Sequence, residues 1–131
     1  KASLEEREHA NELMNYQNMR GGVVNMKNII CNNVNLDKSN DIIESFNIAL
    51  NLEKSINEKL LKLHQVAEEN NDPQFSDYIE GTFLKEQVES ISKLSKIISI
   101  LERFNGNQHD ICNYVDKLEK KNKYLNFSNA L

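Results

Sequence analysis

The sequence predicts an all-α protein built from a few long helices. Only one proline and four glycines occur among 131 residues, so few positions interrupt a helix. Apolar residues recur at helical spacing over long stretches, and the strict alternation of a half-buried strand is nearly absent. Helices that are each apolar on one side bury those sides against one another, so we expect long, antiparallel, packed helices.

The first predicted helix covers about Leu4 to Met19 and ends at Arg20-Gly21-Gly22. Glycine readily takes the left-handed conformation that closes a helix, so the chain should leave the helix there. The stretch from Val23 to Lys38 loses helical period and contains an asparagine-rich run at 31–35. It predicts an extended connection, far longer than the few residues that usually join bundle helices.

The second predicted helix begins after a cap at Ser39 or Asp41 and frays at Glu69-Asn70-Asn71. We call the apolar side of a helix its seam, and this seam contains one charged residue. Its members are Phe46, Ala49, Glu53, Ile56, Leu60, Leu63 and Ala67.

The third predicted helix begins at Asp72-Pro73, because aspartate caps free amides and proline fits the first helical position. It should end near Asn105-Gly106-Asn107. Its seam reads Phe83, Gln87, Ile91, Leu94, Ile98 and Leu101. A short last helix, from Ile111 to about Tyr124, places Ile111, Val115 and Leu118 on one side and leads into a lysine-rich tail.

Composition limits the class of function. The length fits one domain, and the formal net charge of −4, with interleaved acids and bases, offers no basic patch for nucleic acid. No apolar run approaches the roughly 20 residues that span a bilayer, so no membrane partner is expected. Cys31 and Cys112 lie far apart without metal-ligand spacing, so neither a disulfide framework nor a structural zinc site is predicted.

Polar side chains occupy seam positions on all three long helices. Glu6 and His9 lie one turn apart on the first, Glu53 lies on the second and Gln87 on the third. A buried carboxylate requires a partner charge or a metal, and oxygen ligands with an imidazole suit iron, manganese or zinc. Each position also has a simpler interpretation: a solvated Glu6–His9 pair, a Glu53–lysine pair and an exposed Gln87.

Several stretches resemble one known family, the ferritins, in their eukaryotic heavy-chain form. They keep their order and spacing over about Leu4 to Leu101. The stretches are Glu5-Glu6-Arg7-Glu8-His9-Ala10, Leu13-Met14, Tyr16 to Gly22, Ala49 to Lys54, Leu60-Leu61, Leu63-His64, Asn71-Asp72-Pro73, Asp77 to Glu80, and Glu86-Gln87-Val88.

The resemblance implies an iron-storage subunit with ferroxidase activity, in which dioxygen oxidises Fe(II) to Fe(III) at an intra-subunit di-iron centre. By position, Glu6 resembles the carboxylate that bridges two irons, His9 a ligand of one iron and Glu53 a ligand of the other. Gln87 resembles a catalytic-site residue that lies beside the second iron without ligating it. Ile56 stands where a second histidine would complete a symmetric site, so the site should hold iron only transiently.

Further positions are similar to other functional parts of ferritins. Asp77, Glu80 and His64 match the pore through which iron enters the cage, although acids at a helix start also favour the helix dipole. Glu5 and Glu8 match inner-surface acids that seed mineral.

The resemblance also implies a cage of 24 identical or related subunits in the cytoplasm. The upstream helix and about half of the next are missing from this sequence. We therefore expect residues 1–131 to be one partial ferritin-like domain, the rest of a four-helix bundle with one long crossover and a short fifth helix. The alternative is a non-catalytic cage-forming or helical interaction subunit without a functional metal centre.

Overall fold

The structure is a computed structural model that describes the backbone of residues 2–28 and 42–128 and the side chains of 4–28 and 42–121. The chain divides into two compact units, residues 1–34 and 35–131, and each is described here by itself. Every regular element in the described ranges is a helix, which confirms the all-α prediction. The predicted caps Ser39 and Asp41 and most of the predicted connection lie outside the described residues.

The first unit contains one helix, α1 (Ala2–Met19). The predicted glycine stop is confirmed: Gly21 has φ +80°, and the Gly22 amide donates to the Gln17 carbonyl at 2.9 Å. Residues 23–28 have no regular secondary structure, as the loss of helical period predicted.

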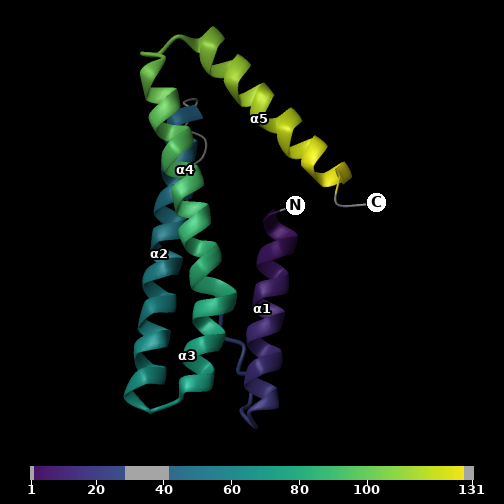
Figure 1. Cartoon of the computed structure of the whole chain (residues 1–131), viewed down its shortest axis with the longest axis vertical. Helices are drawn as coiled ribbons and strands as arrows, with labels where there is room; N and C mark the ends of the chain where they lie inside the picture. Colours follow the sequence, from purple (N-terminus) through teal and green to yellow (C-terminus); the bar gives the residue numbers. More distant parts are fainter. Residues whose placement is uncertain (1, 29–41, 129–131) are drawn as a thin grey trace. The chain divides into compact units, whose positions relative to one another are not determined.

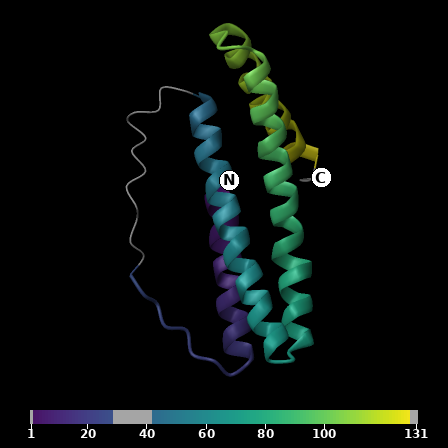
Figure 2. The same ribbon diagram turned by 90° about the vertical axis from the view of Figure 1, so that its left-hand side faces the viewer.

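The second unit is a long antiparallel helical hairpin followed by one more helix (Figures 1 and 2). Its first arm is α2 (Ile42–Glu69). Its second arm is an unbroken helical path through α3 (Pro73–Ile79), the π-helical turn η2 (Glu80–Leu84) and α4 (Lys85–Arg103). The arms pack along the two predicted seams, because Leu60, Ala67, Phe83, Ile98 and Leu101 are all buried.

The turn between the two arms is fixed by hydrogen bonds at Asp72. The Asp72 side chain accepts from the Phe75 amide at 3.1 Å, and Pro73 occupies the first helical position, as the sequence predicted. The buried Ser76 hydroxyl donates to the Glu68 carboxylate at 2.5 Å, which ties the start of α3 to the end of α2.

We expect Asp72→Ala to lower the free energy of unfolding by about 1 kcal/mol, because it removes the acceptor that caps α3. Urea unfolding followed by circular dichroism measures this change. The control is Glu89→Ala, which removes an exposed acid from α4 and should change stability by less than about 0.5 kcal/mol. Equal losses in the two variants would contradict the role of the cap.

The π-helical turn is a feature that the sequence analysis missed. The seam advances by seven residues from Gln87 to Leu94 to Leu101, and the same step backwards from Gln87 reaches Glu80. Ile79 is instead the buried residue and Glu80 is exposed, so the helix contains one residue more than its seam requires. The π turn accommodates that residue and keeps Ile79, Phe83 and Gln87 on the same side.

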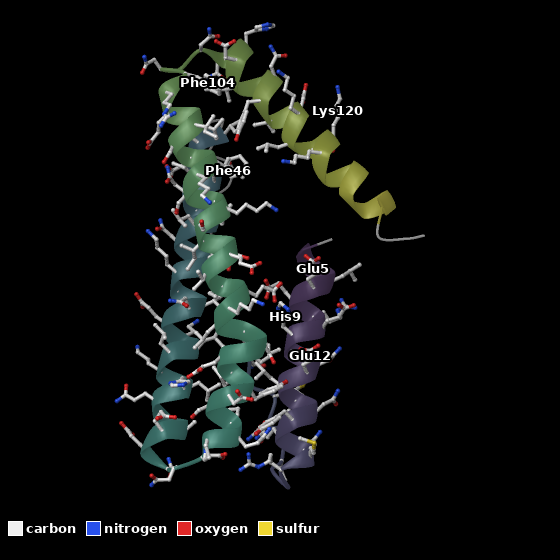
Figure 3. All side chains as sticks on the ribbon, viewed as in Figure 1. Glu5, His9, Glu12, Phe46, Phe104 and Lys120 are labelled. Atoms are coloured by element: carbon white, nitrogen blue, oxygen red, sulfur yellow. The ribbon has the colours of Figure 1, made fainter. Side chains whose placement is uncertain are left out.

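The final helix, α5 (Gln108–Ser128), follows a left-handed bend at Asn105 and Gly106. It extends beyond the predicted segment at both ends, because the Asn107 side chain accepts from the His109 amide at 3.1 Å and so starts the helix early. Buried Ile111 packs with Ile97 and Leu101 of α4, with Phe46 and Phe104 at the edge of this cluster (Figure 3).

Candidate metal centre

Glu6 and His9 lie on the same side of α1. The nearest atoms of their side chains, Glu6 Oε2 and His9 Nδ1, are 3.9 Å apart, and 58% of the Glu6 side chain is exposed. The spacing of one turn brings the two groups together as predicted, although the distance is too long for a hydrogen bond. A carboxylate and an imidazole this close can both reach one cation, and an exposed pair is equally the simpler interpretation made from the sequence.

Glu53 of α2 and Gln87 of α4 form the polar contact between the two seams. Gln87 Nε2 donates to the Glu53 carboxylate at 2.5 Å and to the Glu53 main-chain carbonyl at 2.8 Å. Gln87 is buried and Glu53 is partly buried, so the simpler prediction of an exposed Gln87 is wrong. The Glu53–lysine pair does not occur among the described residues either, since the amide takes that place.

This double contact holds the Glu53 carboxylate in one position. One amide group bonds both the side chain and the backbone of the same residue, which restricts rotation of Glu53. The amide carries no charge, so the carboxylate keeps its full negative charge and its remaining lone pairs for a cation. An aligned and uncompensated carboxylate on a helical seam is what a transient metal ligand requires.

We expect Gln87→Met to destabilise the protein by about 1–2 kcal/mol, because it leaves the partly buried Glu53 carboxylate without its donor. The double variant Glu53→Leu/Gln87→Met should recover most of that loss, since it removes both polar partners. Urea unfolding of the single and double variants completes the thermodynamic cycle. Additive losses would show that the two side chains do not interact.

His64 of α2 and Glu80 at the start of η2 form a second contact between the arms. His64 Nε2 lies 2.6 Å from Glu80 Oε1, and 61% of the Glu80 side chain is exposed. Asp77 is also exposed and lies one turn before Glu80 on the same helical path. The structure therefore brings the three predicted pore residues to one end of the hairpin, near the turn at Asp72.

Glu5 and Glu8, the predicted mineral-seeding acids, are both exposed on α1. Figure 3 labels Glu5, His9 and Glu12 along this helix. Within either unit, the described His, Cys, Asp and Glu side chains form no cluster of three that could hold a metal ion. Each unit thus supplies part of the predicted site, a pair in α1 and a single carboxylate with its amide in the hairpin.

Two features of the site were not predicted from the sequence. The direct His64–Glu80 contact joins residues 16 positions apart, and only a register between the helices predicts it. The π turn had a sequence signal, since the buried residues Ile79, Phe83 and Gln87 are spaced by four and four, a longer step than the seven residues of two regular turns.

Known proteins were compared with the chain after these features had been established. The fold and the seam residues define a helical protein with carboxylate and imidazole groups suited to a hard metal ion. A family model described as a ferritin-like domain matches residues 1–104. The chain belongs to the ferritin family.

Plant ferritins are among its relatives. The chain is 47% identical to a chloroplastic ferritin of Malus baccata var. xiaojinensis over 120 residues, which is 89% of this chain and 47% of that protein. It is 44% identical to chloroplastic ferritin-3 of Arabidopsis thaliana over 119 residues, again 89% of this chain and 46% of the relative. The chain thus spans about half the length of the curated relatives that it matches.

The helices were also checked against the requirements of a membrane span. Among the described residues, none is both long enough and apolar enough to cross a bilayer. The names of the relatives place those proteins in chloroplasts, whereas the sequence analysis predicted the cytoplasm.

Proposed function

We propose that the chain is part of an iron-storage subunit that oxidises Fe(II) to Fe(III) with dioxygen at a di-iron centre and stores the ferric product as mineral. The observation that carries this proposal is the Glu53–Gln87 contact, which holds an uncompensated carboxylate on the seam of the hairpin. Membership of the ferritin family supports it, because it supplies the class of substrate. Glu6 and His9 add a carboxylate and an imidazole at the spacing that iron ligation needs.

In this proposal each side chain has a defined task toward the iron substrate. Glu6 bridges two ions, His9 ligates one of them and Glu53 ligates the other, while Gln87 fixes the Glu53 carboxylate. Carboxylate oxygens stabilise Fe(III) relative to Fe(II), so electron transfer to dioxygen is favoured at such a site. Few ligands per ion leave the ferric product free to move on to the mineral.

The remaining predicted residues serve uptake and storage. Asp77 and Glu80 attract Fe(II) to the end of the hairpin, and His64 fixes one Glu80 oxygen by their 2.6 Å contact. Glu5 and Glu8 supply exposed carboxylates that concentrate Fe(III) where mineral starts. Both roles rest on negative charge that is accessible to solvent.

Assembly and location complete the proposal. The two units form one partial ferritin-like domain, and the subunit assembles with identical or related ferritin subunits into a cage of 24. The cytoplasm is the predicted compartment, and the names of the relatives make the chloroplast the competing one. Fractionation of cells that make the natural protein, followed by detection with an antibody, decides between the two.

A second function follows from the same contacts. Glu53 is already hydrogen-bonded and Glu6 is largely exposed, so these groups can also form a polar network without metal. The chain would then be a non-catalytic cage-forming or helical interaction subunit. The observation that favours this alternative is that no three ligand side chains cluster within either described unit.

Anomalous scattering at the iron edge tests the proposal on crystals soaked in Fe(II). A peak beside the carboxylate of Glu53, with a second one beside His9, is the expected result. Maps without a peak at either residue, from crystals that show ordered side chains there, would favour the alternative without metal.

A further inference from the structure

Asn57 is a polar residue of α2 that the proposed centre does not yet use. It follows Glu53 by four residues, so it lies one turn further along the same side of the helix. Its side chain is partly buried, next to the buried Leu60. It belongs to a line of residues spaced by seven, Leu50, Asn57 and His64, of which Leu50 is buried and His64 contacts Glu80 across the hairpin.

Asn57 differs from the other polar groups of this interface in its hydrogen bonding. Gln87 bonds Glu53, His64 contacts Glu80, and Ser76 bonds Glu68. The Asn57 amide, in contrast, has no hydrogen-bond partner in the part of the chain that the structure describes. A partly buried amide without a partner loses solvation and gains nothing in return, which calls for an explanation.

The chemistry of the amide supplies that explanation. Its carbonyl oxygen is a neutral, hard ligand, of the kind that divalent cations such as Fe(II) and Co(II) accept beside carboxylates. Side chains four residues apart on a helix have Cβ atoms about 5–6 Å apart, close enough to contact one ion between them. Gln87 cannot fill this role, because its amide already donates twice to Glu53.

We propose that Asn57 is a further iron-binding residue, whose side-chain oxygen contacts the metal ion held by Glu53. This inference rests on the proposed function, because it needs an ion at Glu53. It gives that ion a second protein ligand from α2, where Ile56 supplies none. A neutral ligand adds affinity for Fe(II) without adding the charge that would retain Fe(III).

Equilibrium titration with Co(II), followed by its visible absorption, tests the inference on the full chain. Asn57→Ala should weaken binding about tenfold, as the loss of a supporting group commonly does. Asn57→Asp should restore or strengthen binding, because an oxygen returns to the same position with a negative charge. Asn51→Ala is the matched control, since Asn51 is an exposed amide on another side of α2. Circular dichroism shows whether each variant folds.

The outcomes separate this inference from the proposed function. If Glu53→Ala abolishes Co(II) binding and Asn57→Ala leaves it unchanged, the role of Asn57 is rejected and the metal centre stands. If neither substitution alters binding, both proposals fail. Equal weakening in Asn51→Ala and Asn57→Ala would also reject a specific ligand, and so would a failure of Asn57→Asp to restore affinity.

Discussion

Glu53→Ala should slow the oxidation of Fe(II) by about 100-fold or more, the largest effect on activity that we expect from any single substitution. The variant removes the only carboxylate that the hairpin seam directs toward the proposed centre, judged over the described residues. A 100-fold loss corresponds to about 2.7 kcal/mol of transition-state stabilisation, which is reasonable for a direct ligand when supporting groups alone cost 10–100-fold. Stopped-flow absorbance after mixing with Fe(II) and oxygen measures the rate.

A matched substitution on the same helix separates ligation from general damage. Glu58 is an exposed acid of α2, so Glu58→Ala should oxidise Fe(II) at the rate of the parent chain. Gln87→Met provides an intermediate case, because it keeps the Glu53 carboxylate but releases it from its donor. An unchanged rate in Glu53→Ala would reject the role of Glu53, and equal losses in Glu53→Ala and Glu58→Ala would show a loss of fold or charge instead.

The helices could be predicted from the sequence because their ends depend on local chemistry. Asp72-Pro73 starts a helix and Gly21 ends one through interactions within a few residues, and both ends are where the sequence placed them. The π turn depends instead on the register between two distant helices, since only packing against α2 decides that Ile79 is buried and Glu80 is not. Local propensity contains no such information.

The candidate site could be predicted in part for the same reason. Residues on a helical seam can be identified by spacing, so Glu53 and Gln87 were identified as partners of the core before their contact was known. The sequence could not show that one amide holds both the carboxylate and the main chain of Glu53, because this depends on the distance between helices. Asn57 was overlooked because an asparagine at a partly buried position looks like ordinary helix surface until its neighbours are known.

Leu101 is the residue whose truncation should cost the most stability. Its side chain is fully buried in α4, where it joins Ile97 to Ile111 of α5, with Phe46 of α2 and Phe104 packed around them. Leu101→Ala therefore opens a cavity where three helices meet. Such cavities cost about 2–5 kcal/mol, because the surrounding side chains relax only in part.

Urea unfolding followed by circular dichroism measures this loss, and Val88→Ala is the control, since Val88 lies on the same helix with 66% of its surface exposed. Val88→Ala should change the free energy of unfolding by less than about 0.5 kcal/mol. The two substitutions also separate stability from chemistry: in Leu101→Ala, well below its unfolding midpoint, the Glu53–Gln87 contact lies four turns away and Fe(II) oxidation should persist. A loss of less than about 1 kcal/mol would show that α5 does not pack on Leu101 in solution, and a lost activity in folded protein would show that the cluster and the metal centre are coupled.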